Sequence, residues 1–246
     1  MRMKFLILLV LILSFSPGSA LAQPADAGRT DMVIVLGALH ALHGREPAFD
    51  HDRLRRAILA FDPDIAVLEV RPDELSERKD TPGRPEYPAV LWPLLGISRM
   101  QAVAMEPGGE EFSAMATAAS QAFARLRERD PDGAAALSAL DDAVENSLLA
   151  YWARAGQSQD EVTRQSAEAL RTMQVALVGP AFDEVQTRWD RYMVARAVET
   201  VRAHPGKRIL ILGSYRNRHL LEAAINDVAA ERLGDAARFL DDEEPG

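Results

Sequence analysis

The chain has 246 residues, of which 48% are hydrophobic and 26% are charged, a composition typical of soluble globular proteins. Its formal net charge of −9 argues against nucleic acid or an anionic membrane surface as a partner, because both attract a basic surface. The absence of cysteine excludes disulfides and thiolate metal sites, so a metal ion would need histidine, aspartate or glutamate ligands.

Residues 1–22 have the three parts of a secretory signal peptide. Two basic residues precede an apolar run, and Ala20-Leu21-Ala22 provides a small-residue cleavage site. The apolar run is about half of the ~20 residues that span a bilayer, so we expect no stable membrane anchor after cleavage. Residues 23–31 are then a flexible lead-in, and the predicted location is periplasmic or secreted.

The first half of the predicted domain begins with a strand, a helix and a second strand. "MVIVLG" (residues 32–37) and "DIAVLEV" (64–70) are apolar, β-branched runs typical of buried parallel strands. Between them, residues 49–61 have apolar side chains at helical spacing. This order predicts a βαβ unit with a right-handed crossover.

The segment 71–88 is rich in proline and charge, and we expect it to be a long loop that shapes a binding site. The sequence then predicts a third strand, a helical insert, a further helix, a strong strand and a last helix, at about residues 100–107, 110–178, 182–203, 207–213 and 217–234. We therefore predict a single α/β domain over residues 32–240 with a short tail (241–246). Its mixed, largely parallel sheet would be flanked by helices and interrupted by the helical insert.

Polar residues follow three of the predicted strands, namely His40, Glu69 and Arg216. The carboxyl ends of parallel strands share one edge of a sheet, which is where open α/β folds bind ligands. His40 and Glu69 could bind one divalent cation, or the carboxylate could orient the imidazole for proton transfer. Alternatively, Glu69 pairs with Arg71 or another arginine, and His40 only caps a turn.

Other polar residues carry weaker signals. His43 could share a metal with His40, but the following Gly44 favours a surface loop. Glu106 is either a further carboxylate at the edge of the sheet or an exposed turn residue, and Asp190 fits the solvated face of a helix. The sequence contains no G-x-S-x-G elbow, glycine-rich phosphate loop or dinucleotide-binding fingerprint.

Three blocks of the sequence together resemble a known family. "VIVLGALHALH", "LRRAILAFDPDIAVLEVRPDEL" and "DRYMVARAVETVRAHPGKRILILGSYRNRHLLEAAI" are similar to the TraB/GumN/TIKI group and its erythromycin esterase/ChaN-like relatives. In that group a strand ending in G-x-x-H comes first, then a strand ending in glutamate, and a second G-x-x-H comes near the end. The helical middle of this chain matches only in character.

The resemblance implies an α/β fold with a cleft and metal-dependent hydrolysis, including peptidase activity. Gly37 and His40 match the first G-x-x-H, and Glu69 matches the strand-end glutamate, with Arg71 standing in for the arginine that follows it. Gly213 matches the second glycine, but Arg216 stands at the position of the second histidine.

Arg216 changes what this site can do, because a guanidinium offers no lone pair to a metal ion. His219 could fill the gap only if the turn were remodelled, while Arg216 and Arg218 could bind an anion.

One hypothesis is an exported metal-assisted hydrolase that uses Zn, Mn or Co. His40 and Glu69 would be ligands or acid–base groups, and Arg216 would bind substrate or stabilise negative charge. Substrate contacts would come from Gly37, Arg71, Gly213, Arg218 and His219. The alternative is a non-catalytic binding protein for a small anionic ligand or a peptide. The sequence does not predict the oligomeric state.

Overall fold

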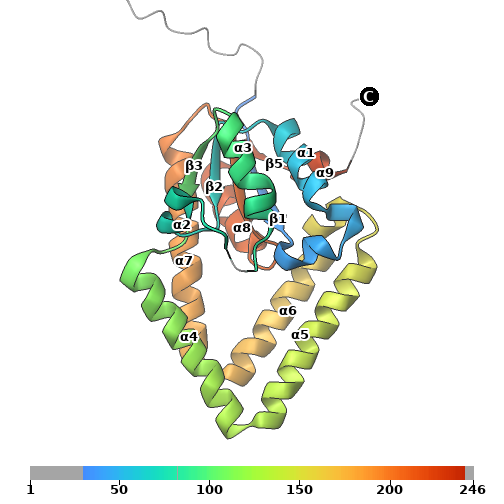
Figure 1. Cartoon of the computed structure of the whole chain (residues 1–246), viewed down its shortest axis with the longest axis vertical. Helices are drawn as coiled ribbons and strands as arrows, with labels where there is room; N and C mark the ends of the chain where they lie inside the picture. The colour runs from blue at the N-terminus through green and yellow to red at the C-terminus, as the bar shows by residue number, and fades with distance from the viewer. Residues whose placement is uncertain (1–29, 82, 242–246) are drawn as a thin grey trace, which may run out of the picture.

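The computed structural model describes residues 30–81 and 83–241 (Figure 1). The predicted signal peptide, the first seven residues of the lead-in and most of the predicted tail lie outside these residues. Within them, no helix combines the length and apolarity that crossing a membrane requires.

A five-stranded sheet forms the centre of the molecule, in the order β3-β2-β4-β1-β5. Every pairing is parallel, so the α/β prediction is confirmed, and the sheet of the described residues is wholly parallel rather than mixed. The strands are β1 (Val33–Ala38), β2 (Ile65–Leu68), β3 (Gln101–Ala104), β4 (Ile209–Ser214) and β5 (Leu233–Gly234).

β4 lies between β1 and β2, although it comes about 140 residues after β2 in the chain. Its register places Gly213 opposite Gly37 and Ser214 opposite Ala38. On its other side, Leu212 is opposite Leu68, so Glu69 continues alongside Gly213. The two glycine motifs of the sequence are therefore neighbours at the same level of the sheet.

Helices cover both faces of the sheet because alternate residues of each buried strand point to opposite sides. Ile34, Leu36 and their counterparts pack under α1 (His51–Phe61), α3 (Trp92–Ile97) and α9 (Ala237–Leu240). On the other face, Val33, Val35 and the strand residues that share their side pack against α8 (Arg218–Ala229) and the second half of α7 (Pro180–Ala203).

The predicted helical insert extends away from the sheet as an arm (Figure 1). It consists of α4 (Gly109–Arg129), α5 (Pro131–Tyr151), α6 (Glu161–Val178) and the first half of α7. Asp130 accepts a hydrogen bond from the backbone of Gly133, so the predicted turn is a tight break at which α5 begins. We call α4–α7 the helical arm.

The segment 71–88 is less irregular than the sequence predicts. It contains the short helix α2 (Pro72–Glu77), and a π-helical turn, η3, begins at Tyr87 (Tyr87–Leu91). Pro72 occupies the first position of α2, where its missing N–H costs no hydrogen bond. Between these two elements, Arg84 lies at the carboxyl end of the sheet, in contact with Glu69.

Candidate functional site

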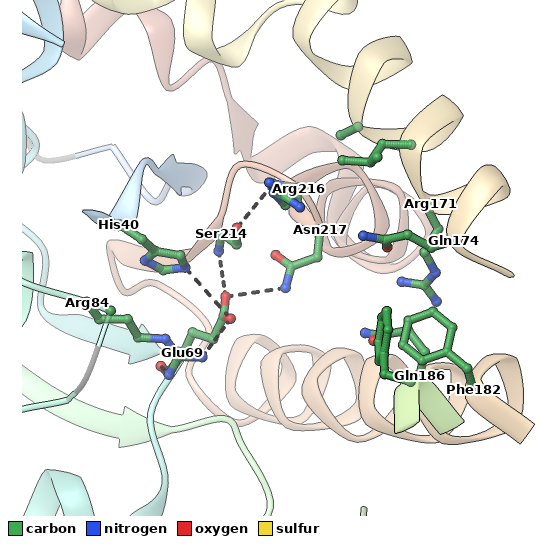
Figure 2. Close-up of a pocket in the computed structure, with 14 residues that line it drawn as sticks. His40, Glu69, Arg84, Arg171, Gln174, Phe182, Gln186, Ser214, Arg216 and Asn217 are labelled. Carbon is green, nitrogen blue, oxygen red and sulfur yellow. Dashed lines mark hydrogen bonds and ion pairs between the residues drawn. The ribbon is translucent and has the colours of Figure 1, made fainter. Parts of the chain in front are cut away.

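A pocket of about 420 Å³ opens between the carboxyl ends of the strands and the helical arm (Figure 2). At the sheet it is lined by His40 after β1, Glu69 after β2, and Ser214 and Asn217 at the end of β4. The remaining lining residues are Gly83, Arg84, Phe123, Ala167, Leu170, Arg171, Gln174, Phe182, Gln186 and Arg216. The structure thus places His40 and Glu69 in one cleft.

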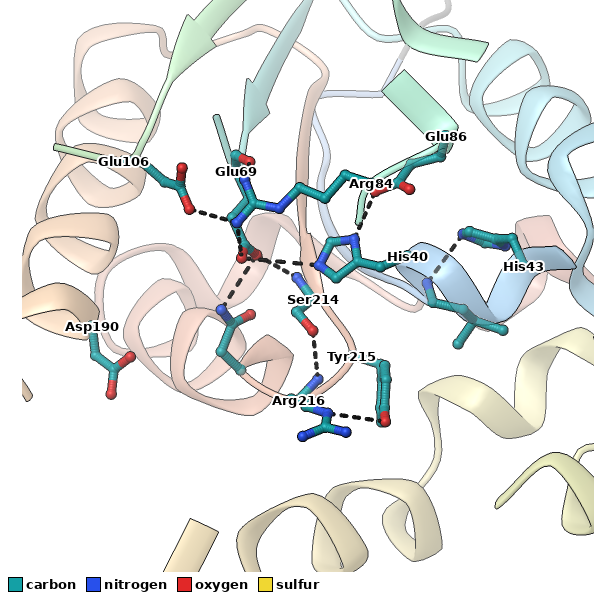
Figure 3. A network of polar contacts seen from close by, with 12 residues as sticks. His40, His43, Glu69, Arg84, Glu86, Glu106, Asp190, Ser214, Tyr215 and Arg216 are labelled. Carbon is teal, nitrogen blue, oxygen red and sulfur yellow. Dashed lines mark hydrogen bonds and ion pairs between the residues drawn. The ribbon is translucent and has the colours of Figure 1, made fainter. Parts of the chain in front are cut away.

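His40 is held by a buried carboxylate. Its backbone adopts a left-handed conformation (φ 53°), and its Nδ1 lies 2.7 Å from Oε1 of the fully buried Glu86 (Figure 3). Because a carboxylate only accepts, Nδ1 carries the hydrogen, and in the neutral imidazole this leaves the lone pair on Nε2. Nε2 makes no hydrogen bond to any described residue and lies 4.0 Å from Oε1 of Glu69. An imidazole in this state can take a proton from a substrate or water.

The ionised state of Glu86 follows from the same contact. Burial alone would raise its pKa, but the hydrogen bond from His40 and the weaker favourable interactions around the carboxylate outweigh burial, and the net shift of the pKa is downward. Glu86 is therefore an anion that orients His40.

Glu69 is buried beside Gly213. Its carboxylate accepts hydrogen bonds from the backbone N–H of Ser214 and from Nδ2 of Asn217 at 3.3 Å. A Cβ at Gly213 would lie 3.2 Å from Oε2 of Glu69, so glycine leaves room for the carboxylate against β4. Gly213 thus supports the site without lining the pocket.

Arg84 supplies the positive charge of the site. Its Nη2 lies 3.0 Å from Glu69 and 2.6 Å from Glu106, and its Nη1 donates to the backbone carbonyl of Glu69. Burial raises the pKa of Glu106, against the lowering effect of Arg84. Burial alone would lower the pKa of Arg84, but the two carboxylates outweigh burial and the net shift is upward. Glu69 therefore forms the ion pair considered in the sequence analysis, with Arg84 rather than Arg71. Glu106 is buried at the edge of the sheet and is not an exposed turn residue.

The donor set does not fit a divalent metal ion. His40 and Glu69 provide two donors, and the guanidinium of Arg84 already occupies one carboxylate oxygen of Glu69. In the described part of the chain, no three histidine, aspartate or glutamate side chains are grouped to hold one metal. A zinc site with an open position normally needs three protein ligands.

Arg216 does not lie beside His40 and Glu69 as the sequence led us to expect. Its guanidinium turns to the helical arm, where it pairs with Asp141 at 2.9 Å and Glu145 at 2.6 Å on α5. Its Nε donates to the hydroxyl of Tyr215, and the side chain still borders the pocket. The reason is electrostatic: two carboxylates on α5 attract this arginine away from the strand ends.

Three further residues predicted to bind substrate have partners within the protein. Arg71 pairs with Asp73 and Glu74 and lies over the ring of Phe112. Arg218 is buried and donates to the backbone carbonyls of Val35 and Gln159. Nε2 of His219 lies 3.5 Å from Glu168 on α6, and His219 is not among the described residues that line the pocket.

Gly37 and His43 are also structural. The side-chain amide of Gln159 bonds both the N–H and the carbonyl of Gly37, and a Cβ there would lie 2.8 Å from Cα of Tyr215. His43 is buried rather than exposed, with Nδ1 donating to Phe49 and Nε2 accepting from Leu39. Neither residue faces the pocket.

The sequence pointed to the segment that supplies the missing site residues but not to the residues themselves. Arg84 and Glu86 belong to "GRPE", in the charged segment after the second strand. Their identity could not be read from spacing, because the path of a loop depends on what it packs against. Comparison of the chain with protein-family models, curated proteins and solved structures found no match.

Proposed function

We propose that the protein is a hydrolase of acyl compounds in which His40 is the general base. The observation that carries the proposal is the His40–Glu86 pair, which leaves Nε2 of His40 without a partner at the wall of the pocket. A base oriented by a carboxylate, with its other nitrogen free of a hydrogen-bond partner among the described residues, is the arrangement that proton transfer requires.

In this proposal a water molecule lies within hydrogen-bond reach of both His40 Nε2 and Glu69, at ~2.8 Å from each. His40 takes a proton from the water, and the hydroxide attacks the carbonyl carbon of the substrate. Arg84 stabilises the negative charge on the carbonyl oxygen. When the tetrahedral intermediate collapses, protonated His40 gives its proton to the departing alcohol or amine, so that water is consumed and an acid is released.

The likeness to the TraB/GumN/TIKI group supports hydrolysis as the reaction and, with the signal-like residues 1–22, supports export to the periplasm. A metal-assisted reaction has less support, because the two donors and Arg84 do not make a metal site. Membership of the family, the export and the reaction are parts of one proposal.

The test is hydrolysis of 4-nitrophenyl esters and of a peptide library by the purified protein. We expect His40→Ala to lower kcat by about 100-fold or more, since general-base catalysis contributes 10²–10⁴-fold. Glu86→Gln should lower kcat less, because an amide still accepts from Nδ1. His204→Ala is the control, because His204 caps the end of α7 and is bound to Thr200.

Two outcomes would contradict the proposal. Equal activity of wild type and His40→Ala would remove His40 from the reaction. Loss of activity in EDTA, restored by Zn, Mn or Co, would show that the metal-assisted version is right.

The alternative of a non-catalytic binding protein for an anionic ligand has one observation in its favour, which is the three arginines at the pocket, Arg84, Arg171 and Arg216. Each of them also pairs with a carboxylate. Anion binding alone gives the His40–Glu86 pair no role, and we therefore place hydrolysis first.

A further inference from the structure

The pocket has a second polar end, away from His40, which the proposed reaction does not use. Figure 2 shows Arg171 and Gln174 of α6 facing Phe182 and Gln186 of α7, with Asn217 between them and the strand ends. All of them except Asn217 come from the helical arm.

Arg171 is held by a buried aspartate. Its Nη2 lies 2.8 Å from Oδ2 of Asp190, and Gln186 Nε2 lies 3.3 Å from Oδ1 of the same carboxylate. Asp190 is 9% exposed, so it is not the solvated helix residue that the sequence suggests. Its position explains why Arg171 stays at the pocket wall.

The far end has a surplus of hydrogen-bond donors. Both oxygens of Asp190 are engaged, whereas the other N–H groups of Arg171 make no hydrogen bond to the described residues. A guanidinium has five N–H donors in a planar fork that matches a carboxylate. The Arg171–Asp190 pair is neutral as a whole, so recognition here depends on these directed donors rather than on net charge.

Apolar side chains of the helical arm line the pocket near Arg171. Leu170 and Ala167 of α6 line it, together with the rings of Phe123 and Phe182, which meet edge to face with centroids 5.1 Å apart. A volume of about 420 Å³ is in the range of small-molecule sites. The pocket therefore suits a molecule that has polar groups at both ends and an apolar part that packs against the arm.

We propose that Arg171 binds a carboxylate of the substrate, and that the substrates are acyl compounds with a free carboxylate at one end and the hydrolysed bond at the other. Asp190 is a positioning residue for Arg171. The inference rests on the proposed function for the reaction, but the carboxylate subsite itself is tested by binding. Hydrolysis adds water across the acyl bond and yields a dicarboxylic acid and the free alcohol or amine.

The kinetic test compares two esters of equal chain length, 4-nitrophenyl octanoate and mono-4-nitrophenyl octanedioate. We expect wild type to prefer the ester with the carboxylate, and Arg171→Gln to lower the ratio of the two kcat/KM values by about tenfold or more, as loss of a charge-assisted hydrogen bond implies. Arg188→Gln is the matched control, because Arg188 is an exposed arginine on α7 that pairs with Glu111. It should keep the wild-type ratio.

Arg171→Gln leaves Asp190 without its cation, so folding must be controlled. The double variant Arg171→Gln/Asp190→Asn removes both charges, and we expect it to keep the wild-type circular dichroism spectrum while losing the preference. A double variant that folds and keeps the wild-type ratio would overturn the subsite.

Direct binding separates failure of the subsite from failure of the proposed reaction. Octanedioate and octanoate are titrated calorimetrically into wild type, His40→Ala and Arg171→Gln. Tighter binding of octanedioate by wild type and His40→Ala, lost in Arg171→Gln, supports the subsite even if no ester is hydrolysed. Equal binding of the two acids by all three proteins would overturn it.

Discussion

His40 and His43 lie three residues apart, yet the structure gives them opposite chemistry. His40 has one nitrogen on Glu86 and the other without a described partner, whereas both nitrogens of His43 are bonded to backbone groups. A histidine that donates from Nδ1 and accepts at Nε2 is neutral by geometry. Of the two, only His40 can exchange a proton with a ligand.

His43 predicts how stability depends on pH. Burial lowers the pKa of His43 from 6.5 to about 4. Because the unfolded chain binds the proton first, stability falls as pH drops from about 6.5 to about 4, by roughly 3 kcal/mol. Urea unfolding of wild type at a series of pH values measures this loss, and His43→Gln should lose about 3 kcal/mol less over the same interval. Parallel curves for the two proteins would contradict the assignment.

Among single residues, the sequence predicts the position of those that directly follow a strand. His40 and Glu69 are readable because each comes directly after an apolar run, and such runs end at one edge of the sheet. The direction of Arg216 is not readable, because it depends on two carboxylates of α5 about 70 residues away. The pairing of Arg171 with Asp190 could not be predicted for the same reason, because it joins two separate helices.

Among the elements, the segment between α2 and η3 does most to form the site. It carries Arg84 to the carboxylates of Glu69 and Glu106 and Glu86 to His40. These contacts are partly buried, and they fix both the position of His40 and the path of the segment.

Arg84→Met should destabilise the protein by about 3–5 kcal/mol at neutral pH, because it leaves two buried carboxylates facing each other without a cation. Adding Glu106→Gln should recover part of the loss. Urea unfolding measures both, with Arg196→Met as the control, because its partner Glu199 is exposed and a surface pair contributes ~1 kcal/mol or less. A cost for Arg84→Met equal to that of the control would show that the buried cluster does not stabilise the fold.

The elements themselves could be predicted to a large extent. Apolar β-branched runs mark β1, β2 and β4, and helical spacing marks α1 and the arm, because burial on one or both faces imposes these patterns. The order of the strands could not be predicted, since β1 and β2 look like an adjacent pair and β4 separates them. Pairing between distant segments leaves no local pattern.

In the whole molecule, the pocket belongs to neither the sheet nor the arm alone. His40 and Glu69 come from the sheet, and Arg171 and Phe182 come from the arm. Arg216 connects the two parts through Asp141 and Glu145.

Arg216→Met should therefore loosen α5 with little effect on global stability. The ion pairs are about a third exposed, so we expect a cost of about 1 kcal/mol or less. Hydrogen exchange followed by mass spectrometry should show faster exchange in residues 131–151 and no change in β4. Unchanged exchange in α5 would mean that the other contacts of the arm hold it in place.

The position of β4 between β1 and β2 also determines when the site can exist. While the chain is being synthesised, β1 has neither of its neighbours, because both β4 and β5 come after residue 208. Glu69 likewise lacks the backbone N–H of Ser214 until β4 has inserted. A nascent chain or a product truncated before β4 thus contains His40 and Glu69 but cannot assemble them, so activity in the proposed reaction indicates that β4 has inserted between β1 and β2.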